Sequence, residues 1–294
     1  MYRRKGNFDE KKIGPALKRL RKGKGYRPNR FYHDICSESQ LYRSECSETM
    51  LSSDKLLKIL TRLNTNSNEF MLLTNYMYAR SKIETEKQLY TAMKHQNLTA
   101  LQQVAQSAED YHLQYGGCYF NHTKSIARAL LSSAENIEVA REYLQPILDH
   151  LFSAKTWFFY EVQLTLRCLP MLELDLAIRY GNKALQAIQD NSLLYYNTGM
   201  AGALFMKLSI YLLDYPEHVT QALEYAKELE KSAATDRCAS QMTYAKVIQQ
   251  ICHFKLKNDE FDENHLHALI NTFKLIGLDH DWQYAQTLMD KNIL

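Results

Sequence analysis

Side chains suited to contact with an anionic polymer gather at the start of the chain. Residues 1–64 carry 16 Lys and Arg against 7 Asp and Glu, whereas residues 65–294 carry 20 against 26. Cationic side chains attract phosphate groups whatever the base sequence. We therefore expect residues 1–64, called the head from here on, to meet an anion and the acidic remainder to meet another partner. The simpler alternative is a basic segment that has no partner.

Further side chains in the head suit the recognition of base edges. Gln40 can pair with adenine and Arg43 with guanine, and Tyr42 can reach a phosphate or a thymine methyl group. Ser37 is placed to cap a short helix over 38–46, which would match the helix that enters the major groove in a helix-turn-helix. Short basic helical domains also bind RNA or acidic proteins, so that alternative stays open. The predicted DNA-contacting residues are Arg19, Lys22, Lys24, Ser39, Gln40, Tyr42 and Arg43.

Composition indicates that helices position these side chains. The chain has 10 Gly and 5 Pro among 294 residues, and 46% of its residues are hydrophobic. Both turn-forming residues fall below their average usage of roughly 7% and 5%, and sheet folds need them at many turns. In the head, an apolar stripe predicts a first helix that ends at Gly23 and Gly25, and Pro28 opens a second helix that runs to about residue 35. We predict an all-α protein.

The segment behind the head is predicted to form paired helices. Pairs start near residues 119, 156, 194 and 236, at intervals typical of helical-hairpin repeats. Such a repeat domain offers a concave groove for a peptide or protein segment, and an irregular bundle is the alternative. Asn136, Asp236 and Pro216 are expected near helix starts, with an interruption at 181–182. The expected helices cover 69–95, 98–115, 121–133, 137–152, 156–169, 172–190, 198–213, 217–233, 236–256, 263–276 and 281–290.

One arginine of the repeat domain suggests a binding site. Arg167 lies in an otherwise apolar helix, where an arginine is usually paired or faces a cavity. It either pairs with Glu161 or Glu173, or holds the carboxylate or backbone of a bound peptide. Nearby amide side chains could hydrogen-bond an extended backbone, and a tyrosine with a wet hydroxyl could line a groove. The predicted peptide-contacting residues are Tyr160, Gln163, Arg167 and Asn197.

Motifs for catalysis, metals and cofactors do not occur in the sequence. It contains no Gly-rich phosphate loop, no Gly-x-Ser-x-Gly and no His-Glu-x-x-His, so we expect no enzyme, no cofactor and no metal site. None of the six cysteines forms a Cys-x-x-Cys pair, which favours reduced thiols in the cytoplasm. The start lacks a signal-peptide pattern, and the longest apolar stretch, 200–213, is too short to span a membrane. We expect a cytoplasmic protein.

Several motifs of the chain resemble those of a known family. Together they resemble the Rgg family (Rgg/GadR/MutR) of transcriptional regulators from Gram-positive bacteria. The resemblance is strongest over 13–70 and covers nearly the whole chain. It rests on Ile13-Gly14, Leu17-Lys18-Arg19-Leu20-Arg21-Lys22-Gly23-Lys24, Ser37-Glu38-Ser39-Gln40-Leu41-Tyr42-Arg43-Ser44-Glu45, Leu56-Leu57-Lys58-Ile59-Leu60-Thr61-Arg62-Leu63-Asn64, Asn68-Glu69-Phe70 and Trp157-Phe158-Phe159-Tyr160-Glu161.

The resemblance implies a cytoplasmic, homodimeric regulator with two domains. Residues 1–66 would form a repressor-type helix-turn-helix that binds double-stranded promoter DNA. Residues 67–294 would form a right-handed helical-repeat (TPR-like) domain that dimerises and receives a short signalling peptide, as in quorum sensing by a peptide pheromone. The alternative is a helical-repeat interaction module whose basic head binds a protein or RNA.

The head departs from the family pattern at three positions. Ser44 replaces an aromatic core residue, Tyr32 replaces a small alanine, and Ser47 replaces the glycine of the following turn. That turn favours a positive φ, which glycine adopts freely and other residues adopt with strain. We therefore expect Ser47 to have a positive φ.

Overall fold

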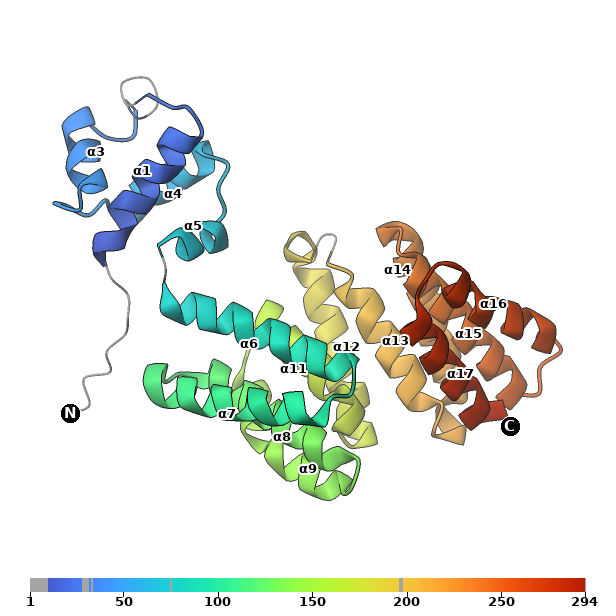
Figure 1. Ribbon diagram of the computed structural model, residues 1–294. Coiled ribbons are helices and arrows are strands. Elements are labelled where there is room, and N and C mark those ends of the chain that lie inside the picture. Colours follow the sequence, from blue (N-terminus) through green and yellow to red (C-terminus); the bar gives the residue numbers. More distant parts are fainter. Residues whose placement is uncertain (1–9, 28–31, 33, 75, 196–197, 294) are drawn as a thin grey trace. The chain divides into compact units, whose positions relative to one another are not determined.

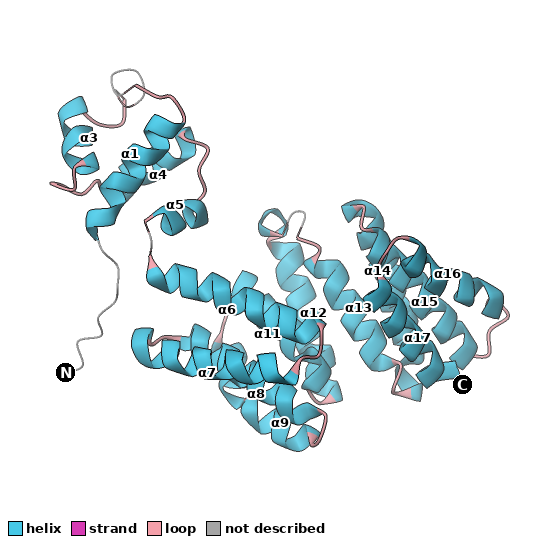
Figure 2. Cartoon of the chain, viewed as in Figure 1, coloured by secondary structure: helices cyan, strands magenta, loops and turns pink. Residues whose placement is uncertain are grey.

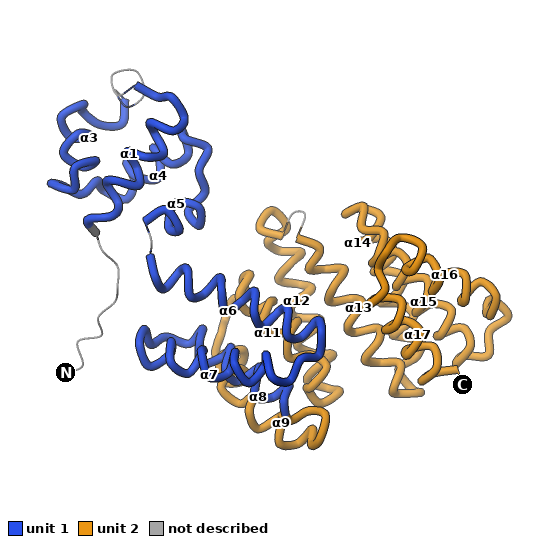
Figure 3. The backbone as a smooth tube through the Cα atoms, in the orientation of Figure 1, with its two compact units in different colours: residues 1–131 blue, residues 132–294 orange. Residues whose placement is uncertain are grey.

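The computed structural model describes residues 10–27, 32, 34–74, 76–195 and 198–293. Every regular element in these ranges is a helix (Figures 1 and 2). The predicted all-α fold class is therefore confirmed. The chain forms two compact units, residues 1–131 and 132–294 (Figure 3).

The short helices of the head surround a core of their own in unit 1. Leu17 and Ile59 are fully buried there, and Leu41 is almost fully buried. The core also takes in Phe70, beyond residue 66, and the domain boundary at that residue stays a prediction. The predicted second helix falls largely on 28–31 and 33, outside the described residues. The head elements are η1 (Glu10–Lys12), α1 (Ile13–Gly23), α3 (Glu38–Glu45), α4 (Ser53–Arg62) and α5 (Ser67–Leu73).

Local sequence signals fix several of the helix ends. Ser37 caps α3, since its Oγ accepts a hydrogen bond from the Gln40 backbone N–H at 3.1 Å. The predicted stop of α1 is also present, with Gly25 at a φ of 76° just beyond the helix end. Asn136 caps its helix by accepting from two backbone N–H groups. These predictions are confirmed.

Three longer helices complete unit 1, and only the last two residues of the third fall in unit 2. They are α6 (Met77–Lys94), α7 (Leu98–Tyr115) and α8 (Cys118–Ser133). The predicted bounds of α7 are correct, and its Asn97 cap accepts from the Ala100 N–H at 2.9 Å. Aromatic rings join these helices, with Tyr78 packing edge-on against Phe120 at a centroid distance of 5.5 Å.

Unit 2 is a stack of helical hairpins. Helices α11, α13, α15 and α17 contact one another in that order, and α12, α14 and α16 connect them. The elements of unit 2 are α9 (Ile137–Tyr143), α10 (Gln145–Ser153), α11 (Phe159–Cys168), η2 (Leu169–Met171), α12 (Leu174–Asp190), η3 (Ser192–Leu194), α13 (Met200–Leu212), η4 (Pro216–His218), α14 (Val219–Asp236), α15 (Ala239–Lys255), α16 (Glu263–Leu275) and α17 (Asp279–Ile293).

Some sequence predictions about helix ends were wrong. The segment 69–95 is two helices, α5 and α6, and 137–152 divides at Leu144 into α9 and α10. Asp236 is the last residue of α14 rather than a helix start, because Arg237 takes a left-handed φ of 52° there.

The predicted interruption at 181–182 is also wrong, since α12 continues through it. A Cβ added at Gly181 would lie 2.7 Å from Leu208 Cδ2 of α13. The glycine therefore allows two helices to approach closely and does not break one.

Candidate functional site

The predicted recognition helix α3 has one buried face and one exposed face. Leu41 and Ser44 point into the head, whereas Ser39 and Arg43 are exposed and Tyr42 is 62% exposed. Exposed polar side chains on the outer face of a short, anchored helix are free to contact an external partner. This arrangement suits the reading of base edges in a groove.

A buried ion pair that the sequence analysis did not identify anchors α3 against α1. Arg21 Nε and Nη2 donate to the two carboxylate oxygens of Glu45 at 2.6 and 2.7 Å, and Nη1 donates to the Tyr26 carbonyl at 2.9 Å. The hydrogen bond to Glu45 raises the pKa of Arg21 although burial opposes it. Such a bidentate pair fixes orientation as well as distance. Its signal in the sequence was an arginine within an otherwise apolar stripe.

The turn after α3 has the expected strained conformation. Ser47 has a φ of 63°, as predicted from the missing glycine. Its Oγ donates to the Lys11 carbonyl at 2.7 Å, which ties the turn to the start of α1. The close approach of α1 requires Gly14, because a Cβ there would lie 2.1 Å from the Ser44 carbonyl oxygen.

The remaining predicted DNA-contacting side chains differ in their exposure and in their hydrogen bonds within the head. Arg19 and Lys22 are exposed on α1. Lys24 is exposed, but its Nζ donates to the Leu63 carbonyl at the end of α4. Gln40 is half-buried, and its Oε1 accepts from Lys55 Nζ at 2.9 Å. Gln40 must therefore either exchange this contact or present only its NH₂ group to a base.

Three of the four predicted peptide contacts share one face of α11. Tyr160, Gln163 and Arg167 are spaced three and four residues apart, so their side chains line up along the helix, and all three are half-buried. The Tyr160 ring packs edge-on against His150 at 5.6 Å. Asn197 lies outside the described residues.

The carboxylates that were considered as partners of Arg167 do not pair with it. Glu161 accepts from the Phe158 N–H at 3.0 Å and contacts His150 Nε2 at 2.9 Å. These contacts hold the pKa of Glu161 below its ordinary value although burial opposes the charge. Glu173 is exposed and forms no ion pair within the described ranges. An ion pair with Glu161 or Glu173 therefore does not account for the presence of Arg167 in an otherwise apolar helix.

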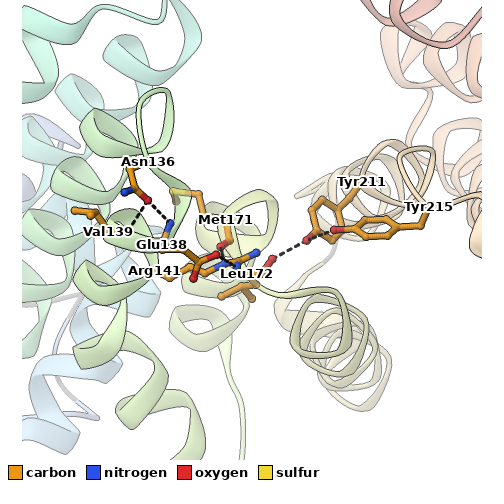
Figure 4. A network of polar contacts seen from close by, with 8 residues as sticks. All are labelled: Asn136, Glu138, Val139, Arg141, Met171, Leu172, Tyr211 and Tyr215. Carbon is orange, nitrogen blue, oxygen red and sulfur yellow. Dashed lines mark hydrogen bonds and ion pairs between the residues drawn. The ribbon is translucent and has the colours of Figure 1, made fainter.

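A polar network holds the backbone that follows α11 (Figure 4). Arg141 Nε donates to the Met171 carbonyl at 3.2 Å, and the Tyr211 hydroxyl donates to the Leu172 carbonyl at 2.6 Å. Tyr215 donates to the Tyr211 oxygen at 3.1 Å, and Glu138 holds the Arg141 guanidinium at 2.6 Å. Residues of α9 and α13 thus fix the turn into which Arg167 leads.

Two other kinds of feature are absent from the described residues. Within them, no group of three or more His, Cys, Asp or Glu side chains is arranged to hold a metal ion. No described helix is both long and apolar enough to cross a membrane.

The fold and these surfaces define a class of protein with a small helical head and a helical-repeat body. Comparison with protein families gives a match over residues 80–287 to the family described as HTH-type transcriptional regulator Rgg, C-terminal domain. The chain belongs to the Rgg family of transcriptional regulators, as its motifs indicated. This family consists of regulators rather than enzymes, which agrees with the sequence prediction.

Solved structures share the fold over almost the whole chain. The SHP pheromone receptor Rgg2 of Streptococcus dysgalactiae has 21% identity and a TM-score of 0.73, covering 96% of this chain and 100% of its own. A putative transcriptional regulator of Listeria monocytogenes has 17% identity and a TM-score of 0.73, covering 97% and 98%. PlcR of Bacillus thuringiensis, in complex with the peptide PapR7 and DNA, has 15% identity and a TM-score of 0.67, covering 95% and 99%. No curated protein matches the chain.

Proposed function

We propose that this protein is a cytoplasmic, homodimeric transcriptional regulator that binds promoter DNA through residues 1–66 and is controlled by a short peptide bound by residues 67–294. The observation that carries the proposal is the exposed face of α3, held against α1 by the buried Arg21–Glu45 pair. Membership of the Rgg family supports it. The likeness to PlcR, solved with both a peptide and DNA, supports both partners.

The roles in DNA binding follow from the chemistry of each side chain. Arg43 is proposed to read guanine, and Gln40 adenine through the group that Lys55 leaves available. Ser39 and Tyr42 complete the contacts from α3. Arg19, Lys22 and Lys24 are proposed to bind phosphates, which supply affinity without base choice.

The DNA part is tested by selecting genomic fragments with the full-length protein and measuring affinity for the enriched site. Arg43→Ala is expected to weaken that site by roughly 5- to 150-fold and to relax the preference at one base pair, because a bidentate base contact discriminates by about 1–3 kcal/mol. Lys22→Ala is expected to weaken all duplexes alike and to reduce the salt dependence by about one phosphate contact.

The matched control is Lys87→Ala, an exposed lysine of α6 outside the head. It should leave both properties unchanged. If no genomic fragment is enriched, or if RNA or an acidic protein is retained in its place, the head has a different partner and the DNA proposal is wrong.

Control by a peptide is proposed to act through the half-buried face of α11. Tyr160 supplies an aromatic wall, and Gln163 and Asn197 supply amide groups for an extended backbone. A peptide that binds one arrangement of the repeat domain better than another shifts the dimer between states that bind DNA and states that do not. Helix α11 contacts both α12 and α13, so a peptide on its face would act on a helix that touches the next hairpin.

The peptide part is tested with short peptides secreted by the source bacterium and fractionated by mass. Gln163→Ala is expected to weaken binding of the active fraction by about 5- to 10-fold, the effect of roughly one net hydrogen bond. Gln186→Ala, an exposed glutamine of α12, is the control. If Gln163→Ala and Gln186→Ala bind the active fraction equally well, the α11 face is not part of the peptide site. If the control Gln186→Ala loses binding, the cause is unfolding.

A further inference from the structure

A lysine at the start of α4 holds the side chain of one residue that is predicted to contact DNA. Lys55 lies in the first turn of α4, and its Nζ donates to Oε1 of Gln40 on α3 at 2.9 Å. Both side chains are half-buried in the head. Burial raises the pKa of the Cys36 thiol, and the charge of Lys55 opposes this shift, so the ammonium group lies against the head. Lys55 was not among the residues singled out from the sequence.

The orientation of the Gln40 amide follows from this contact. An ammonium group has three donors and no acceptor, so the amide atom that faces Lys55 must be the carbonyl oxygen. The backbone N–H of Gln40 donates to the Ser37 Oγ at 3.1 Å, which fixes the backbone from which the side chain extends. The NH₂ group of Gln40 makes no hydrogen bond within the described residues. Gln40 therefore offers an external partner a free donor, while its acceptor is engaged.

The contact with Gln40 distinguishes Lys55 from the next lysine of α4. Lys58 is exposed and forms no hydrogen bond or ion pair within the described ranges. The ion pairs found in the described part of the head do not include Lys55 either, so no carboxylate competes with Gln40 for its ammonium group. The charge of Lys55 is thus met by a neutral amide on the predicted recognition helix.

This orientation restricts which bases Gln40 can distinguish. An unrestrained glutamine pairs with adenine through two hydrogen bonds, in which its NH₂ group donates to N7 and its Oε1 accepts from the N6 amino group. Oε1 of Gln40 keeps a second lone pair, but a base amino group that used it would lie beside the Lys55 ammonium, and two positively polarised groups repel each other. The bond to adenine N7 remains. Guanine has acceptors at both N7 and O6, so the same NH₂ group binds guanine at least as well.

We propose that Lys55 is a positioning residue of the DNA-binding surface, which widens the base preference of Gln40 from adenine to both purines. This inference rests on the DNA binding proposed above, and it refines the contact given there for Gln40. Lys55 acts by occupying Oε1, so it needs no contact of its own with a base. Loss of the Lys55 ammonium group is expected to free Oε1 and to restore the selection of adenine.

The test uses the full-length protein and a library of randomised DNA duplexes, selected at one fixed salt concentration and sequenced. The base pair that Gln40 reads is the one whose preference disappears with Gln40→Met. At that base pair the wild type is expected to retain adenine and guanine within about twofold of each other. Lys55→Met is expected to favour adenine over guanine by about fivefold or more, the lower end of what a bidentate base contact discriminates.

Three further variants separate positioning from charge and from structure. Lys55→Arg keeps a cationic donor near Oε1 and should give the wild-type preference. Lys58→Met removes an exposed charge of the same helix and should also keep that preference, with any loss of affinity shared by all duplexes. The double variant of Gln40→Met and Lys55→Met should match Gln40→Met alone, because Lys55 acts through the amide. A purely structural role of Lys55 would weaken binding without changing the preference at one base pair.

The outcomes separate this role from DNA binding itself. If the wild type enriches a motif but already selects adenine over guanine at that base pair, or if Lys55→Met leaves the preference unchanged, only the role of Lys55 is overturned. The same holds if Gln40→Met changes the preference at no base pair. If the wild type enriches no duplex although its circular dichroism spectrum is helical, DNA binding fails, and the role of Lys55 fails with it.

Discussion

Two cationic side chains, the buried Arg21 in the head and the half-buried Lys207 in the repeat domain, differ in what surrounds them. Arg21 has a bidentate carboxylate partner and a backbone carbonyl within 2.9 Å. Lys207 has no partner among the described residues and lies near a second cation. A paired buried charge is satisfied within the fold, so it orients helices. An unpaired one is costly until something external satisfies it.

The comparison explains why the two parts of the chain suit different tasks. The head presents a surface whose shape is set before any partner arrives, which suits the reading of a rigid duplex. Lys207 of the repeat domain has no internal partner among the described residues, so its charge stays costly in the fold. Under the proposed peptide control, a ligand that satisfied such a charge in only one of two states would shift the protein towards that state.

The largest expected effect on stability comes from breaking the Arg21–Glu45 ion pair. Glu45→Gln leaves Arg21 buried without a carboxylate and is expected to lower the free energy of unfolding of the head by about 3–5 kcal/mol. Urea unfolding and amide hydrogen exchange in α1 and α3 measure this change. Asp34→Asn is the matched control, because Asp34 pairs with Arg62 at 2.6 Å with its side chain 50% exposed, and it should change stability by at most about 1 kcal/mol. If Glu45→Gln and Asp34→Asn lowered the free energy of unfolding equally, burial would not be the reason for the strength of the Arg21–Glu45 pair.

A smaller effect on stability, of opposite sign, is expected from replacing Lys207. Lys207→Met should stabilise the repeat domain at pH 7 by up to about 3 kcal/mol, since it removes a charge that burial disfavours. A lysine with a folded-state pKa near 8, below its ordinary value of 10.5, destabilises the fold fully below pH 8. As the pH rises from 8 towards 10.5 the folded state loses its proton first, so the wild type gains stability and the advantage of Lys207→Met shrinks.

Urea unfolding of wild type and Lys207→Met at pH 7 and pH 10 measures this difference. The control Lys183→Met, which removes an exposed lysine of α12, should show no such dependence. A destabilising Lys207→Met, or an advantage that does not change with pH, would mean that Lys207 is satisfied in the fold and that the comparison with Arg21 fails.

The smallest effect is expected at the turn of the head. Ser47→Gly relieves a positive φ but removes the hydrogen bond from Oγ to the Lys11 carbonyl, two effects that are each about 1 kcal/mol and oppose each other. Stability should therefore change by at most about 1 kcal/mol in thermal unfolding. A loss as large as that of Glu45→Gln would show that the turn, and not the ion pair, anchors α3.

Predictions from the sequence succeeded where local patterns control the structure. The bounds of α7, the Ser37 and Asn136 caps, and the positive φ at Ser47 depend on a few neighbouring residues. They failed at Gly181 because the glycine there responds to Leu208 of another helix, which no local pattern reveals. The placement of Tyr160, Gln163 and Arg167 on one face followed from helical spacing, but their surroundings did not.

The sequence by itself determined the helical class, the basic head and the family, since composition, spacing and motifs need no distant contacts. The tertiary structure alone decided which charges are satisfied. Arg21 and Glu45 are 24 residues apart, and Arg167 and Lys207 lie on different helices, so their environments depend on which helix faces meet. Charge energy depends on burial and on distance, and both are set only when the helices pack.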